Sequence, residues 1–188
     1  ENLTFSILFK PESLKAEDQF SVSEAVTLGI LDYLGSKGIE AKIKWPNDIY
    51  VADKKICGIL IENSVSKGMI SHSVVGIGLN VNQTVFLSDA PNPVSIANIT
   101  GNRYNIHKEL ILLTEFIEAE YDSKEGDLRK RFLENLYRIN EWHEYIDCAT
   151  KTRFKGKITG VDRSARLLVL NDMGAEKAYA FKEITYCI

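Results

Sequence analysis

The stretch KWPNDIYVADKKICGILIE, residues 44–62, decides the fold that the sequence predicts. Proline fixes its own φ and disfavours the helical region for the residue before it, so Trp45 is expected to be extended. Residues 49–51 are strand formers, polar turn residues follow at 53–54, and residues 56–61 are apolar again. The pattern predicts two strands joined by a tight turn.

Polar groups are concentrated in this stretch beyond what a turn requires. Lys44, Asn47, Asp48 and Lys55 are four groups able to hold a phosphate or the metal ion that accompanies it. The alternative is that the lysines are surface charges and that WPND is a structural turn. Phosphate binding is the first functional hypothesis.

Three glycines interrupt the neighbouring strands. Gly76 and Gly78 lie two residues apart in a predicted strand, 72–82, so both face the same side of the sheet. They leave a flat furrow without side chains, which suits a planar fused-ring ligand. Gly58 breaks an apolar run, and it is either a point of close backbone approach or a bulge or packing glycine. No third glycine opens a helix, so GIG is not a dinucleotide-binding fingerprint.

Two asparagines continue the glycine face beyond the furrow. The amides of Asn80 and Asn82 offer a donor and an acceptor together, which is what reading an adenine edge requires. The alternative is hydrogen bonding at the end of the strand. Residues 85–103 are loop-rich, and the apolar run 94–96 either closes over a ligand or covers the core.

Composition limits the remaining possibilities. The 188 residues fit one domain of ordinary size with a small appendage, and the net charge of −3 argues against a nucleic-acid-binding face. No apolar run approaches the ~20 residues that span a bilayer, so we expect no membrane association. Cys57, Cys148 and Cys187 lack metal-ligand spacing. We interpret them as reduced thiols of a cytoplasmic protein, or as small buried hydrophobes.

The predicted fold class is α+β, with a mixed, mostly antiparallel sheet and helices on one side. The expected strands are 3–9, 39–51, 56–62 and 72–82, with a polar hairpin at 63–71 and helices at 20–38, 105–122 and 126–137. From about residue 146, short runs of strand formers split by glycines predict a small barrel of antiparallel strands.

Local signals add two further expectations. Ser21 or Ser23 is the expected cap of the first helix. Arg129, Lys130 and Arg131 are expected on a solvated helix face.

Three segments in register resemble the catalytic core of biotin protein ligases. They are KWPND at 44–48, KKICGILIE at 54–62 and VVGIGLNVN at 74–82. The β-rich tail resembles the SH3-like domain that ends bacterial biotin ligases. The resemblance implies a fold similar to class II aminoacyl-tRNA synthetases and biotin ligases, with a catalytic domain at 1–145 and an SH3-like domain at 146–188.

The same resemblance implies a reaction. Biotin and ATP, with Mg²⁺, would give biotinyl-5′-AMP, and the biotin would pass to a lysine of a biotin carboxyl carrier protein. Carried over position by position, Lys55 matches the main catalytic lysine. The implied sets are catalytic Lys55, Lys44 and Asp48; biotin-binding Lys55, Gly58, Leu60, Gly76 and Gly78; ATP-binding Lys44, Asn47, Asp48, Lys55 and Asn80; and Asp48 as metal ligand.

The chain departs from the family pattern at its start. Family members carry a glycine- and arginine-rich loop and further polar contacts ahead of the first strand, and some carry a DNA-binding helix-turn-helix, none of which precedes Glu1. We therefore expect either a ligase fragment that adenylates poorly alone, or a non-catalytic remnant that binds biotin or a carrier.

Two further expectations follow from the resemblance. A lipoyl or octanoyl transferase of the same fold is the other enzymatic alternative, and the pair GILIE and GIGLNVN argues against it. The strand edges near 56–62 and 72–82 are where two copies would meet in a homodimer.

Overall fold

The computed structural model describes residues 1–87, 92–123 and 128–188. Its larger sheet has five strands in the order β1-β5-β4-β3-β2, and every ladder between neighbouring strands is antiparallel. The predicted α+β class with a mostly antiparallel sheet is confirmed. The strands are β1 (Leu3–Phe9), β2 (Lys42–Lys44), β3 (Asp48–Val51), β4 (Lys54–Ser66) and β5 (Met69–Leu79).

The single strand predicted at 39–51 is wrong, because the chain forms two strands there. Residues 45–47 make a tight turn, and Lys44 pairs with Asp48 across it. The Trp45–Pro46 peptide bond is cis. The next turn falls at residues 52–53, with Ala52 at φ 50°. Apolar alternation is the same in one long strand and in two short ones, so the pattern alone does not separate them.

The hairpin of β4 and β5 is longer than predicted. The polar hairpin predicted at 63–71 is present, with its turn confined to residues 67–68 and the polar residues on either side paired as strands. Cross-strand hydrogen bonds between polar side chains support this extension, such as Ser73 Oγ donating to Asn63 Oδ1 at 2.6 Å. At its other end β5 stops at Leu79, three residues before the predicted end. Both β4 and β5 are inner strands in the strand order, but β3 pairs with β4 only as far as Gly58. The predicted edge is therefore wrong for β5 opposite β1 and holds for the part of β4 beyond Ile59, where no described strand pairs on the β3 side. The homodimer stays a prediction.

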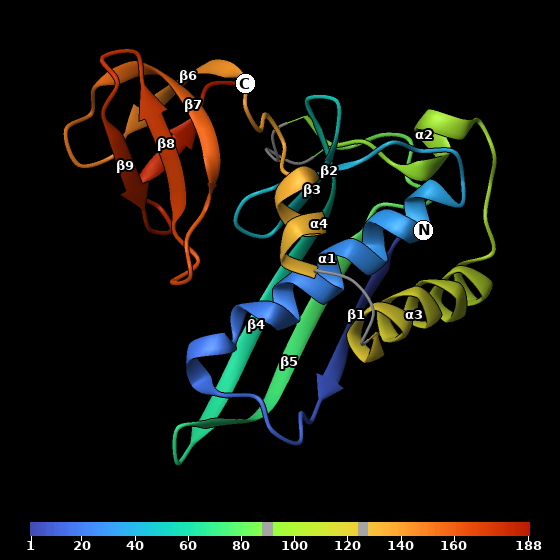
Figure 1. Cartoon of the computed structure of the whole chain (residues 1–188). Helices are drawn as coiled ribbons and strands as arrows, with labels where there is room; N and C mark the ends of the chain where they lie inside the picture. The colour runs from blue at the N-terminus through green and yellow to red at the C-terminus, as the bar shows by residue number, and fades with distance from the viewer. Residues whose placement is uncertain (88–91, 124–127) are drawn as a thin grey trace.

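Two long helices cover one face of this sheet (Figure 1). They are α1 (Phe20–Gly35) and α3 (Ile106–Asp122). Alternate strand residues such as Leu3, Val75 and Ile77 are buried under them, while Thr4, Leu8 and Leu60 on the opposite face are exposed. The sheet therefore has a packed face and an open face.

The two helices approach each other closely at a glycine. A Cβ on Gly29 would lie 2.6 Å from Ile117 Cα, so only glycine fits this crossing. The predicted serine caps are wrong. The N-cap of α1 is Gln19, which makes no side-chain hydrogen bond, and Ser21 and Ser23 lie inside the helix.

Two shorter helices occupy the segments that connect these layers. α2 (Ile96–Thr100) lies inside the segment 85–103 that was predicted to be loop-rich. A short 3-10 helix, η1 (Ala16–Asp18), precedes α1. The run 94–96 is buried, so it covers the core rather than closing over the open face. α4 (Leu128–Glu134) ends before the predicted residue 137 because Ile43 N–H donates to Asn135 O and Tyr137 N–H donates to Ile43 O. The predicted start, 126, lies outside the described residues.

A second five-stranded sheet follows, in the order β10-β6-β7-β8-β9. In Figure 1 it stands apart from the long hairpin, near β2 and β3. Its strands are β6 (Trp142–Asp147), β7 (Arg153–Val161), β8 (Leu167–Asn171), β9 (Glu176–Tyr179) and β10 (Ile184–Tyr186). All of its ladders are antiparallel, as expected for the tail. The domain boundary at 145/146 and a closed barrel stay predictions.

The expectation of a solvated face at residues 129–131 is wrong for both arginines. Arg129 pairs with the buried Glu24, and Arg131 pairs with Glu120 and Asp32. A run of charged residues marks a solvent-exposed helix face only when no other element packs over it. Here α4 packs against α1. Within the described ranges, no helix has the length and apolarity needed to cross a membrane.

Candidate active site

Four of the predicted site residues lie in one row across the open face of the larger sheet. Lys44 pairs with Asp48, Asp48 with Gly58, Gly58 with Gly78, and Gly78 with Thr4. Residues that pair directly in a ladder point to the same face. The ladders therefore bring together residues from all five strands at one level of the sheet.

The glycines leave the open face bare next to this row. A Cβ on Gly76 or Gly78 would meet no protein atom closer than 3.7 Å, so packing within the chain does not require glycine at either position. A Cβ on Gly58 would lie 3.2 Å from Lys55 Nζ, so a side chain there would displace the lysine. These distances favour the furrow interpretation over packing glycines.

A cavity of about 450 Å³ lies over the glycines. Seven of its lining residues belong to the predicted sets: Asn47, Asp48, Lys55, Gly58, Leu60, Gly76 and Gly78. Thr4 and Ser6 of β1 also line it and were missed in the sequence. The alternation of β1 was the available signal, since it turns both hydroxyls away from the packed residues Leu3 and Phe9.

Lys55 reaches this face because of a β-bulge. Residues three apart in a regular strand point to opposite faces, which would separate Lys55 from Gly58. The register shifts so that Ile49 pairs with Cys57 and Tyr50 with Lys55, leaving Ile56 without a partner on β3. The bulge turns the lysine onto the open face, where its Nζ lies 2.6 Å from Asp48 Oδ1.

The backbone at the bulge is held by a third segment. Lys55 N–H donates to Asn92 O, and Val94 N–H donates to Lys55 O, each at 2.9 Å. The side chain itself stays 35% exposed, so its ammonium is accessible from the furrow. Lys55 is thus fixed at its base and free to meet a ligand at its tip.

Lys44 lies on the other side of Asp48, in a second cavity of about 480 Å³. Its Nζ is 5.1 Å from the ring centroid of Tyr50 and 4.7 Å from that of Tyr186, on β10. Burial lowers the pKa of Lys44 below its usual 10.5, against the opposing attraction of Asp48. Asn47 and Asp48 line both cavities, so they form the wall that the two share.

The predicted asparagines differ in what they do. Asn47 Nδ2 donates to Ile59 O at 2.6 Å, and the backbone carbonyl of Asn47 accepts from Ile59 N–H. Asn47 therefore fastens the turn to β4. Asn80 follows β5 and donates from Nδ2 to Val94 O at 3.1 Å, outside the lining of the glycine cavity. Asn82 is bonded through both ends of its amide to the backbone of Tyr104. The strand-end alternative therefore describes Asn82, and the adenine role of Asn80 stays a prediction.

The site offers few ligands for a cation. No group of three His, Cys, Asp or Glu side chains suited to a metal occurs among the residues that the structure describes. Asp48 is the acidic residue in the linings of both cavities. The arrangement suits a ligand that brings its own anionic oxygens.

Comparison with known proteins finds relatives among biotin protein ligases. Residues 1–80 match the family described as "Biotin/lipoate A/B protein ligase family". The bifunctional ligase/repressor BirA of Bacillus spizizenii is 27% identical over 93% of this chain, and the biotin--[acetyl-CoA-carboxylase] ligase of Paracoccus denitrificans is 27% identical over 82%. The chain spans 55% of the length of the first relative and 68% of the second.

A solved structure shares the fold over nearly the whole chain. The biotin protein ligase of Aquifex aeolicus in complex with biotin and ATP superposes with a TM-score of 0.73 and 24% identity, covering 98% of this chain and 77% of that one.

Proposed function

We propose that this chain is the catalytic part of a biotin–protein ligase, because residues 1–80 match the family described as "Biotin/lipoate A/B protein ligase family". It activates biotin with ATP to biotinyl-5′-AMP and releases pyrophosphate. It then transfers the biotin to a lysine of a biotin carboxyl carrier protein. The observation that carries the proposal is the position of Lys55, whose ammonium lies over Gly58 and against Asp48 at the end of a furrow bare of side chains.

The furrow supports binding of a flat, fused-ring acid. Gly76 and Gly78 let a ring contact the strand backbone, and Leu60, 62% exposed, offers an apolar side chain beside them. Such an exposed leucine gains burial only when a ligand covers it. Thr4 and Ser6 provide hydroxyls on the far side of the furrow for the polar atoms of the ring system.

Lys55 supports the chemistry of adenylation. The step brings a carboxylate oxygen to the α-phosphate of ATP, forms a mixed anhydride and releases pyrophosphate. Both partners are anionic, so a fixed cation at their meeting point lowers the barrier. The carboxylate end of a ligand lying in the furrow points toward Lys55, and Asp48 holds the ammonium in place before the ligand arrives.

The nucleotide end is assigned to the shared wall and the second cavity. Lys44 supplies a cation, and Asn47 and Asp48 present polar atoms to both cavities. One carboxylate is enough for Mg²⁺, which is commonly held by one or two carboxylates and the phosphates of the substrate. Asp48 would hold it, and the ion would neutralise phosphate charge.

Pyrophosphate release on the full-length protein tests this proposal. Adding biotin with Mg·ATP should release pyrophosphate, and labelled biotin should then appear on a carrier domain only if its acceptor lysine is intact. Lipoic and octanoic acids serve as matched controls and should release none. Release with those acids and not with biotin would move the assignment to a lipoyl or octanoyl enzyme. Biotin binding without any release would leave a binding protein.

A further inference from the structure

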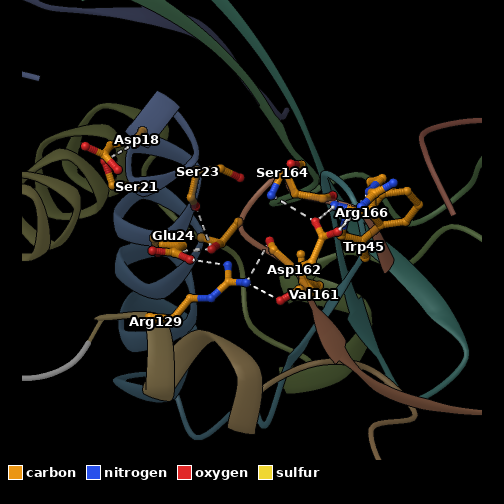
Figure 2. Close-up of polar contacts among 12 residues, drawn as sticks. Asp18, Ser21, Ser23, Glu24, Trp45, Arg129, Val161, Asp162, Ser164 and Arg166 are labelled. Atoms are coloured by element: carbon orange, nitrogen blue, oxygen red, sulfur yellow. Dashed lines mark hydrogen bonds and ion pairs between the residues drawn. The ribbon is translucent and has the colours of Figure 1, made fainter. Parts of the chain in front are cut away.

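The turn between β7 and β8 of the second sheet contacts the turn that carries the site residues. Trp45 lies between Lys44 and Asp48, is 4% exposed, and donates from its indole Nε1 to Ala165 O at 2.9 Å (Figure 2). This hydrogen bond joins residues from opposite halves of the sequence. It ties a side chain of the predicted phosphate-binding turn to the backbone of the second sheet.

The β7–β8 turn, residues 162–166, is braced so that this carbonyl is held in place. Asp162 Oδ1 accepts from the backbone N–H of Ser164 and of Arg166, both at 2.9 Å, and Asp162 Oδ2 accepts from Arg166 Nε at 2.8 Å. Ala165 adopts a left-handed φ of 62°, a conformation that a non-glycine residue keeps only when its surroundings hold it. The direction of the Ala165 carbonyl is therefore fixed by the turn itself.

Arg129 of α4 clamps the same turn onto α1. Its guanidinium donates to Val161 O and, at 2.9 Å, to Asp162 O, while its Nη1 donates to Glu24 Oε1 at 2.7 Å (Figure 2). The Glu24 side chain is only 8% exposed. A guanidinium fork can meet two carbonyls and a carboxylate together, whereas a lysine ammonium is a single point charge. Arg129 is thus placed to set the distance between the β7–β8 turn and the larger sheet.

We propose that Arg129 is a positioning residue for the phosphate end of the site. It acts through the β7–β8 turn and Trp45 on the turn from Lys44 to Asp48. The ring-binding part of the furrow, at Leu60, Gly76 and Gly78, is formed by the ladders of β1, β5 and β4, outside this chain of contacts, whereas Asn47 and Asp48 at its Lys55 end belong to the turn. Loss of the fork therefore loosens the phosphate end and leaves the ring-binding part of the furrow intact. The kinetic part of this inference rests on the proposed function, and the structural part does not.

Hydrogen–deuterium exchange on the full-length protein tests the structural part without any activity. Arg129→Lys keeps a cation beside the buried Glu24 carboxylate but loses the fork to the two carbonyls. We expect exchange at residues 43–50 and at 161–166 to rise about fivefold, as for one lost hydrogen bond. The β4–β5 hairpin near residues 64–71 should not change. Lys130→Met is the matched control, because Lys130 is an exposed neighbour on α4 paired with Glu134.

Trp45→Phe gives a second test from the other end of the contact. It keeps an aromatic ring and removes the N–H donor, so exchange should rise at 161–166. If Arg129→Lys loosens 161–166 and leaves 43–50 unchanged, the turn does not transmit to the site and the proposal is wrong. The same conclusion follows if Trp45→Phe has no effect on 161–166.

Kinetics then separate positioning from general destabilisation. Both variants should lower kcat/KM for ATP about five- to tenfold while the Kd for biotin stays unchanged, and the double variant should be less than additive because both act through one contact. Equal loss of biotin affinity would assign Arg129 a merely structural role and overturn the proposal. If the unmodified protein shows no adenylation at all, the proposed function fails, and the exchange results still decide whether Arg129 holds the turn.

Discussion

Gly78→Ala separates the ligand role of the furrow from the folding of the sheet. The nearest protein atom to a Cβ at this position is Gly58 O at 3.9 Å, an ordinary van der Waals distance. The backbone φ of Gly78 lies outside the left-handed region that favours glycine. The added methyl therefore meets no protein obstacle, and the loss of glycine freedom in the unfolded state should raise the free energy of unfolding by about 0.4–1 kcal/mol.

A ring lying on the strand backbone meets the same methyl directly. Displacing it from contact costs about 1–3 kcal/mol, the usual penalty for overpacking a fitted site, or roughly a 5- to 150-fold rise in the Kd for biotin. Urea denaturation gives the stability and titration calorimetry gives the Kd. The prediction is a more stable protein that binds biotin more weakly.

Gly29→Ala is the matched control for this experiment. Its Cβ would lie 2.6 Å from Ile117 Cα, so it should destabilise the protein while leaving the Kd of the folded fraction unchanged. If Gly78→Ala destabilises the chain, the glycine serves packing. If it leaves biotin affinity intact, the ring does not lie on the furrow, and the assignment of the site is refuted.

Three other predictions concern charged groups. Lys55→Ala should lower kcat for biotin-dependent pyrophosphate release about 10²- to 10³-fold with little change in the Kd for biotin, because its ammonium meets charge that develops in the transition state; a raised KM with unchanged kcat would contradict this role. Burial lowers the pKa of Lys44, so as pH rises the ammonium loses its charge at a pH below the usual 10.5, and kcat/KM for ATP should fall in that pH range. Lys44→Arg keeps its charge and should abolish this fall in kcat/KM at high pH. The Lys37 ammonium lies 2.5 Å from the Glu109 carboxylate, and its side chain is 10% exposed. Glu109→Ala removes this carboxylate, so the free energy of unfolding in urea should fall by about 3–5 kcal/mol while the Kd for biotin stays unchanged. Lys130→Met, at an exposed ion pair, is the control.

The sequence predicted most of what alternation and glycine placement control. Gly76 and Gly78 share a face because strand periodicity is two, and the structure places both on the open side. The long amphipathic helix α3 was predicted almost to its ends, since its apolar repeat is a local signal. These features depend on neighbours in the chain.

Features that depend on pairing could not be predicted in the same way. The bulge at Ile56 decides which face Lys55 occupies, yet nothing in KKICG distinguishes a bulge from a regular strand. Only the resemblance to a family placed Lys55 and Gly58 together. The role of Arg129 was missed for a similar reason, because its partners lie on α1 and in the β7–β8 turn, far away in the sequence.

The contact between Lys44 and Tyr186 has a consequence for how the protein matures in the cell. The strands that form the glycine furrow are complete once β5 has been synthesised, whereas Tyr186 lies on β10, near the other end of the sequence. At about 5–20 residues per second, a ribosome needs on the order of ten seconds to pass from one to the other. Throughout that interval the strands of the furrow have been synthesised, and Lys44 still lacks the ring of Tyr186. The phosphate end therefore gains its aromatic cover later in synthesis than the strands of the furrow appear.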